Sequence, residues 1–133
     1  MAFKDKLREL RDSQSITQSE LAARVGVTTR TLQNYEMGRS YPKNQAVVTK
    51  LCFVLGCKPS ELFSVEEEFV VEAAEAHGGR GAARAKSIIA QTSALFAGGD
   101  LDAEDREAFL RAIMQIYFEA NRRAKSDAPQ KSE

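Results

Sequence analysis

The chain of 133 residues is 43% hydrophobic and 29% charged, which suits one ordinary domain, or a small domain with an appendage, and excludes a generally disordered protein. Its net charge of zero hides an asymmetry, because residues 1–64 carry ten basic and six acidic side chains whereas residues 65–133 carry nine and thirteen. No apolar run approaches the roughly 20 residues of a membrane span, and the N-terminus lacks the apolar core of a signal peptide, so we expect a cytoplasmic protein.

The first predicted helix covers residues 2–13. Phe3, Leu7 and Leu10 stand one turn apart along it and define a single apolar face. Its remaining positions are largely basic, and most of these cations are expected to be solvated surface. A basic N-terminal half nevertheless suits a protein that docks on phosphate groups.

The next stretch predicts two short helices, over residues 18–25 and 29–37, joined by a tight turn. Thr17 is expected to cap the first helix through its hydroxyl oxygen. Gly26 stands where that helix must stop, since glycine adopts a positive φ without a Cβ penalty. Thr28 is expected to cap the second helix in the same way.

The second of these helices has one apolar and one polar face. Leu32 and Tyr35 fall on the inward side at helical spacing. The outward side carries Thr29, Arg30, Gln33 and Asn34. Arginine pairs with guanine, and asparagine or glutamine with adenine, through two hydrogen bonds each in the major groove. The pattern therefore predicts a helix-turn-helix whose second helix presents side chains suited to base edges.

This stretch resembles the lambda-repressor-like helix-turn-helix family of phage repressors, Cro proteins and bacterial regulators, often called the XRE family. The matching residues stand at the family's spacing: Gln18, Leu21, Ala22, Gly26, Val27, Leu32, Tyr35, Glu36, Gly38 and Pro42. The resemblance covers residues 1–64. It implies an all-α, five-helix DNA-binding domain, followed here by a helical C-terminal extension.

The resemblance also implies which residues contact DNA. They are Gln18, Thr28, Thr29, Arg30, Gln33, Asn34, Arg39, Ser40 and Lys43. In the family, the glutamine that begins the second helix binds phosphate and braces the recognition helix, and Gln18 matches it. The loop after the recognition helix lies along the phosphate backbone, where Arg39, Ser40 and Lys43 are chemically suited. Such phosphate contacts supply affinity and salt dependence but no sequence reading.

One expected role in this domain is structural. The family typically pairs an arginine of the first helix with the glutamate that follows the last core aromatic of the recognition helix. In this chain the two residues are Arg11 and Glu36. A partly buried pair of this kind fixes the angle between the two helices, because breaking it would leave a poorly solvated charge.

The remainder of the domain is predicted to be two helices. The first covers residues 45–55 and is ended by Gly56, and Pro59 can occupy the first position of a second, short helix. Cys52 and Cys57 have the spacing of neither a redox motif nor a metal-ligand pair, so Cys52 is expected to be a small core residue.

Residues 65–126 are predicted to be a helical, dimerising region, with two alternatives left open at its start. The acidic run Glu66–Glu68 suits a helix N-terminus, so residues 66–76 can form a helix, but Phe69–Val71 can equally form a short strand. His77 has no second ligand or nucleophile nearby in the sequence, so no catalytic or metal-binding role is expected for it.

Two further helices are expected, over residues 80–97 and from Asp102 to about Lys125. The second carries two adjoining apolar stripes, although a helical hairpin needs only one. The surplus is assigned to dimerisation through Phe109, Leu110, Ile113, Met114, Ile116 and Tyr117. Residues 127–133 are predicted to be a disordered tail.

These patterns, together with the resemblance to the family, imply a sequence-specific, DNA-binding transcriptional regulator, which the resemblance suggests is a repressor that binds a palindromic operator as a homodimer. The alternative is an antitoxin, or a regulator whose C-terminal helices bind a partner protein and whose DNA binding is auxiliary. No cofactor or metal is expected. An enzyme is not expected either, because the histidine, the cysteines and the scattered carboxylates form no recognisable catalytic constellation.

Overall fold

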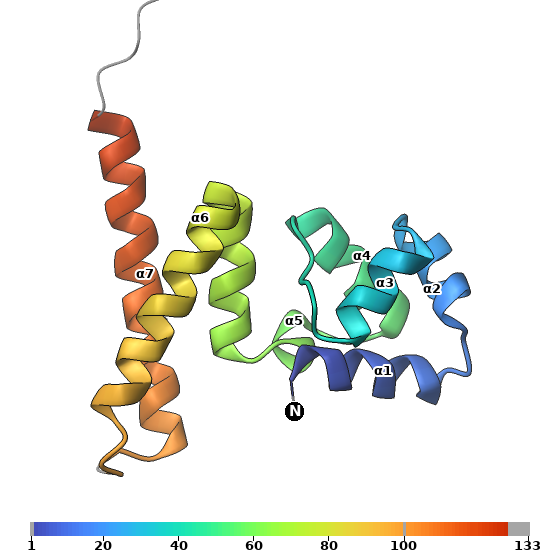
Figure 1. Ribbon diagram of the computed structural model, residues 1–133, viewed down its shortest axis with the longest axis horizontal. Helices are drawn as coiled ribbons and strands as arrows, with labels where there is room; N and C mark the ends of the chain where they lie inside the picture. The colour runs from blue at the N-terminus through green and yellow to red at the C-terminus, as the bar shows by residue number, and fades with distance from the viewer. Residues whose placement is uncertain (1, 100, 128–133) are drawn as a thin grey trace, which may run out of the picture. The chain divides into compact units, whose positions relative to one another are not determined.

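The computed structural model describes residues 2–99 and 101–127, and this part of the chain forms helices and no strands (Figure 1). The all-α prediction is therefore confirmed. The helices are α1 (Phe3–Ser13), α2 (Gln18–Val25), α3 (Thr29–Glu36), α4 (Gln45–Leu55), α5 (Pro59–Leu62), α6 (Val65–Leu95) and α7 (Ala103–Asp127). The alternative left open for residues 66–76 is resolved as helix. No described helix has an apolar stretch long enough to cross a membrane.

The chain divides into two compact units, Met1–Ile88 and Ile89–Glu133. The first holds α1 to α5 and most of α6, so the division into compact units falls inside α6. The reason is that α6 supplies core residues to the first unit: Val71 belongs to the same buried cluster as the leucines of α1 to α5.

Local signals in the sequence set the ends of α2, α3 and α4. The Thr17 hydroxyl accepts a hydrogen bond from the Glu20 N–H at 3.0 Å, and the Thr28 hydroxyl accepts one from the Thr31 N–H at 3.1 Å. Asn44 caps α4 in the same way through its side-chain oxygen. Gly26 closes α2 in the left-handed conformation, with φ 86°, which allows the sharp turn into α3.

The core of the first unit is made by one apolar face from each of α1 to α5. Leu7, Leu21, Leu32 and Leu51 are completely buried in it. The ring of Phe3 forms a second centre, since it stacks on Phe63 with centroids 4.6 Å apart and also contacts two tyrosine rings. Burial of this apolar area is what holds the short α2 and α3, which are too brief to be stable helices alone.

Glu67 connects three separate segments of the first unit. With Ser64 it forms the capping box of α6, in which each residue's side chain accepts the other's backbone N–H. The same carboxylate accepts the Phe3 N–H at 3.0 Å and the Tyr41 hydroxyl at 2.9 Å. It thereby supplies the cap that Ala2 does not give to α1. No pattern in the sequence indicates this role for Glu67.

Helix α6 is interrupted at Gly78, whose φ of 65° and ψ of −149° are not helical. Figure 1 shows α6 as two arms, and the chain reverses direction between them. The two arms lie so close that a Cβ on Gly81 would stand 2.1 Å from the Ala73 carbonyl oxygen. Only a residue without a side chain fits at that position. The glycines therefore both break the helix and permit its two arms to pack.

The second unit consists of the end of α6, a turn and α7. Asp102 caps α7 by accepting the Asp105 N–H at 2.8 Å, as the sequence predicted. The rings of Phe96 and Phe109 meet edge to face with centroids 5.0 Å apart. Helix α7 continues to Asp127, the first residue of the predicted disordered tail, and residues 128–133 lie outside the described part of the chain.

Candidate DNA interface

Helix α3 presents the polar face that the sequence predicted. Leu32 is fully buried and Tyr35 is 4% exposed, so both anchor the helix to the core. On the opposite side Arg30 and Gln33 are exposed, while Thr29 and Asn34 are half-buried. Within the described part of the chain the Arg30 and Gln33 side chains form no hydrogen bond or ion pair. Their donors and acceptors therefore face solvent.

Arg11 and Glu36 are brought together by the fold of α1 onto α3. The Arg11 guanidinium donates to both carboxylate oxygens of Glu36, from Nε at 2.7 Å and from Nη2 at 3.0 Å. It also donates to the Ile16 carbonyl oxygen, which ties the start of the α2 segment to α1. The Glu36 side chain is completely buried. This fork-to-fork geometry fixes the orientation of α3 more firmly than a single charge contact would.

Gln18 is the first residue of α2, and its amide nitrogen donates to the Glu36 carboxylate at 3.2 Å. Arg8 approaches the same carboxylate at 3.5 Å. Glu36 thus receives side chains from both helices that flank α3. This contact uses one N–H donor of the Gln18 side-chain amide and leaves the other for a further partner. Gln18 is half exposed at the N-terminus of α2.

The ionisation of this cluster follows from its contacts. Burial raises the pKa of Glu36, but hydrogen bonds from Arg11 and Gln18 and the charge of Arg11 outweigh it and leave the pKa below its ordinary value. The hydrogen bond to Glu36 raises the pKa of Arg11, although burial opposes it. Glu36 is therefore a carboxylate and Arg11 a cation at neutral pH, so the pair stays ionised wherever the protein works.

The loop after α3 is anchored by its apolar residues and exposes its cations. The Gly38 and Arg39 N–H groups donate to carbonyls of α3, and Gly38 takes a φ of 74°. Pro42 is fully buried, and Tyr41 stacks on the Phe3 ring. Arg39 and Lys43 remain exposed, and Ser40 is half-buried. Such a loop offers two charges on a fixed backbone, which suits contact with phosphates.

The residues assigned to dimerisation divide into two groups. Leu110 and Met114 are buried within the chain. Phe109 is 41% exposed and Ile116 is 64% exposed, whereas Ile113 and Tyr117 are half-buried. A surface for a second copy would therefore be centred on Ile116 and the exposed edge of Phe109, and not on the whole stripe.

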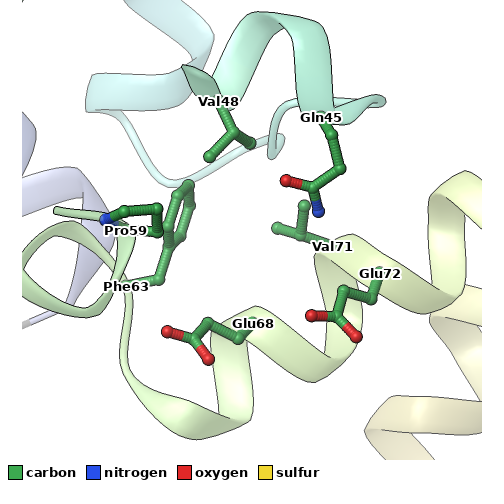
Figure 2. A pocket seen from close by; sticks show the side chains of 7 residues that line it. All are labelled: Gln45, Val48, Pro59, Phe63, Glu68, Val71 and Glu72. Carbon is green, nitrogen blue, oxygen red and sulfur yellow. The ribbon is translucent and has the colours of Figure 1, made fainter. Parts of the chain in front are cut away.

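A cavity of about 260 Å³ lies between α4, α5 and α6 (Figure 2). Val48, Phe63 and Val71 form its apolar wall, and the carboxylates of Glu68 and Glu72 lie on one side. Burial, together with the charges of Glu68 and Glu75, raises the pKa of Glu72. Acidic side chains repel phosphate, so the lining of this cavity does not suit contact with a nucleic-acid backbone.

The described residues include no group of three or more histidine, cysteine or acidic side chains arranged to hold a metal ion. Cys52 and Cys57 are free thiols, and burial raises the pKa of Cys52 to about 12. A thiol held protonated in this way is a poor nucleophile and a poor metal ligand.

Comparison with known proteins gives a match within the N-terminal part of the chain. A protein-family model described as helix-turn-helix matches residues 7–62, which span α1 to α5 apart from the first turn of α1. The resemblance seen in the sequence is thereby confirmed for this segment, whose family is one of DNA-binding regulatory domains. Comparisons with curated proteins and with solved structures found no match.

Proposed function

We propose that the protein is a sequence-specific transcriptional repressor that binds a palindromic operator as a homodimer. The helix-turn-helix match supports DNA binding and transcription regulation. The observation that supports sequence-specific reading is the geometry of α3, which exposes Arg30 and Gln33 to solvent while its other face is fixed to the core by Leu32, Tyr35 and Glu36.

Base reading is assigned to three side chains of α3. Arg30 can donate two hydrogen bonds to O6 and N7 of a guanine. Gln33 and Asn34 can each pair with N6 and N7 of an adenine. The contribution of the scaffold is to restrict the angle at which they enter the groove, because Glu36, at the end of the same helix, is bound from α1 and α2.

Affinity is assigned to the phosphate contacts around the groove. Arg39 and Lys43 lie on the anchored loop, and Gln18 lies at the N-terminus of α2, where backbone N–H groups favour an anion. These contacts are insensitive to sequence and weaken as salt is added, since binding releases counterions from DNA.

Homodimerisation is assigned to α7. Two copies related by a two-fold axis would place their α3 helices in successive major grooves about 34–36 Å apart, which requires a near-palindromic operator. Ile116 and Phe109 are large apolar side chains that the described fold leaves exposed. Repression would then follow when the bound dimer covers promoter DNA and excludes the polymerase.

Selection from a pool of random duplex DNA tests the proposal directly. The full chain is expected to enrich one motif with two inverted half-sites, and binding of the enriched DNA should be at least about 1,000-fold tighter than binding of random DNA. The Arg30→Ala variant should enrich a motif degenerate at one base of each half-site. Enrichment of no motif by the wild-type chain would refute sequence-specific regulation.

Arg24→Ala is a matched control for the Arg30 experiment. Arg24 is an exposed arginine of α2 that lies outside the assigned set, so its loss changes the net charge equally. It should leave the enriched motif intact. Equal losses of Arg30→Ala on the motif and on random DNA would remove Arg30 from the base-reading residues.

A further inference from the structure

A second cavity in the first unit, of about 420 Å³, lies between the loop after α3 and α6. The loop contributes residues 38–43, and both arms of α6 contribute, from Val70 to Lys86. Its volume falls within the range of roughly 300–1,000 Å³ that is usual for small-molecule sites. It is unlike the cavity of Figure 2 in the charge of its lining.

The lining combines an apolar wall with cations and has no acidic side chain. Val70, Ala74, Ala82 and Pro42 supply apolar surface. Arg39, Lys43 and Lys86 are the charged residues of the lining, and all three are exposed to solvent. An apolar wall with a basic opening is complementary to a molecule that has an apolar body and an anionic group.

The break in α6 creates the space. Gly78 and Gly79 line the cavity, and Ala74 and Ala82 line it one turn to either side of the reversal. Four small residues at a helix reversal leave a hollow that ordinary side chains would fill. The close packing of Gly81 against Ala73 holds the two arms in the arrangement that keeps it open.

From this arrangement we infer that the cavity binds a small organic anion with an apolar body, such as an aromatic carboxylate or sulfonate. The apolar part lies against Val70, Ala74 and Ala82. The anionic group pairs with Lys86 and with the loop cations. Either part alone is a weak ligand, because the apolar wall is shallow and the cations are solvated.

Ligand binding is expected to oppose DNA binding, and this step rests on the proposed function. Arg39, Ser40 and Lys43 line the cavity and are also the residues assigned to the phosphate backbone. An anion held by Arg39 and Lys43 competes with phosphate for the same charges. The ligand therefore binds the DNA-free protein better than the DNA-bound protein, and by linkage it lowers the affinity for DNA.

Titration of the full chain with three probes tests the binding step without DNA. 1-Naphthalenesulfonate has both parts, inorganic sulfate has only the charge, and 1-naphthalenemethanol has only the apolar body. The sulfonate is expected to bind saturably at one site per chain, at least about tenfold more tightly than either of the others. Equal binding of the sulfonate and the uncharged alcohol, or no saturable binding of the sulfonate, would overturn the inference.

Two variants of the second arm of α6 locate the site. Lys86→Ala should weaken sulfonate binding about tenfold, since it removes one charge-assisted contact. Arg84→Ala is the matched control, because Arg84 is an exposed cation on the same helix arm but is not part of the lining, and it should bind as the wild type does. Equal effects of the two variants would show that only net charge matters and would contradict the assigned site.

Ala82→Leu fills the hollow and should abolish sulfonate binding, with an unchanged circular dichroism spectrum as evidence of folding. Retention of full sulfonate affinity in a folded Ala82→Leu variant would overturn the inference. The coupling is tested by adding the sulfonate to the protein bound to its selected DNA. Displacement supports competition, and undiminished DNA binding at saturating sulfonate refutes it. A chain that binds the sulfonate but no DNA would retain the cavity site and refute the proposed function.

Discussion

At the scale of single residues, Glu36 has the largest predicted effect. It is completely buried and accepts hydrogen bonds from Arg11 and Gln18. Glu36→Gln removes the charge that compensates Arg11, so we expect the free energy of unfolding to fall by about 3 kcal/mol. Urea denaturation measures this fall in the free energy of unfolding. Glu20→Gln serves as the control, because Glu20 is exposed, and it should change stability by less than about 0.5 kcal/mol.

The same carboxylate predicts a loss of stability in acid. Burial raises the pKa of Glu36, but its hydrogen bonds outweigh this and leave the pKa below its ordinary value of 4.5. A carboxylate whose pKa is lower in the folded state stabilises the fold above its ordinary, unfolded-state pKa of 4.5. This contribution is lost as the pH falls through the lowered folded-state pKa. The difference in unfolding free energy between wild type and Glu36→Gln should therefore shrink as the pH falls from about 5 to well below the ordinary pKa of 4.5. A constant difference over this interval would contradict the assignment.

The contact between Glu67 and Tyr41 predicts that a substitution of Glu67 changes the pKa of Tyr41. The pKa of Tyr41 is raised to about 12, mainly by burial. The hydrogen bond that Tyr41 donates to Glu67 and the negative charge of Glu67 raise it further. Glu67→Gln removes the charge, so the Tyr41 pKa should fall toward its ordinary value of 10 without reaching it, because burial persists. Ultraviolet absorbance titration records the ionisation, and Tyr41→Phe identifies which transition belongs to this residue. An unchanged transition in Glu67→Gln would exclude the contact.

At the scale of elements, the packing of the two arms of α6 predicts different effects of substitution at two of its glycines. Gly81→Ala places a Cβ 2.1 Å from a backbone oxygen, and the two arms must move apart, so a loss of about 1–3 kcal/mol is expected. Gly79→Ala is the control, since nothing lies within 4 Å of its Cβ position and its φ is not positive. That change should be neutral or stabilising by up to about 1 kcal/mol. Thermal denaturation of both variants provides the comparison, and equal effects would contradict the close crossing.

How far the sequence predicts these elements depends on the range of the interactions that determine them. The caps Thr17 and Thr28 act on residues three positions away, and the spacing of Leu32 and Tyr35 reports a helical face directly, so α2 and α3 were predicted with their correct starts. The reversal at Gly78 was visible only as a break, because the sequence does not show that two helix arms then pack.

The contacts of Glu67 could not be predicted, since Phe3 lies 64 positions away and Tyr41 lies 26 away. Its place in an acidic run suggested only a favourable charge at a helix N-terminus. The candidate DNA interface was predictable because its residues lie close together in the sequence, whereas the cavity beside α6 brings together residues from 38 to 86.

At the scale of the whole molecule, the exposed part of α7 predicts the oligomeric state. Ile116 is 64% exposed, and a dimer through α7 would bury it. Ile116→Lys is expected to shift the protein from dimer to monomer and to weaken binding to a palindrome far more than binding to a single half-site. Light scattering coupled to size-exclusion chromatography measures the mass. Gln115→Lys, at the exposed neighbouring position, should remain dimeric, and a dimeric Ile116→Lys variant would place the interface elsewhere.

The carboxylate of Glu67 also determines where the chain can be cut for laboratory work. A fragment ending at Ser64 contains every helix of the matched family segment but loses the acceptor for the first amide of α1 and for the Tyr41 hydroxyl. Its N-terminal turn would fray, and the loop carrying Arg39 and Lys43 would lose an attachment point. Expression of the N-terminal helical module by itself therefore calls for a stop codon beyond the first arm of α6, and amide exchange at Phe3 would report whether the chosen endpoint suffices.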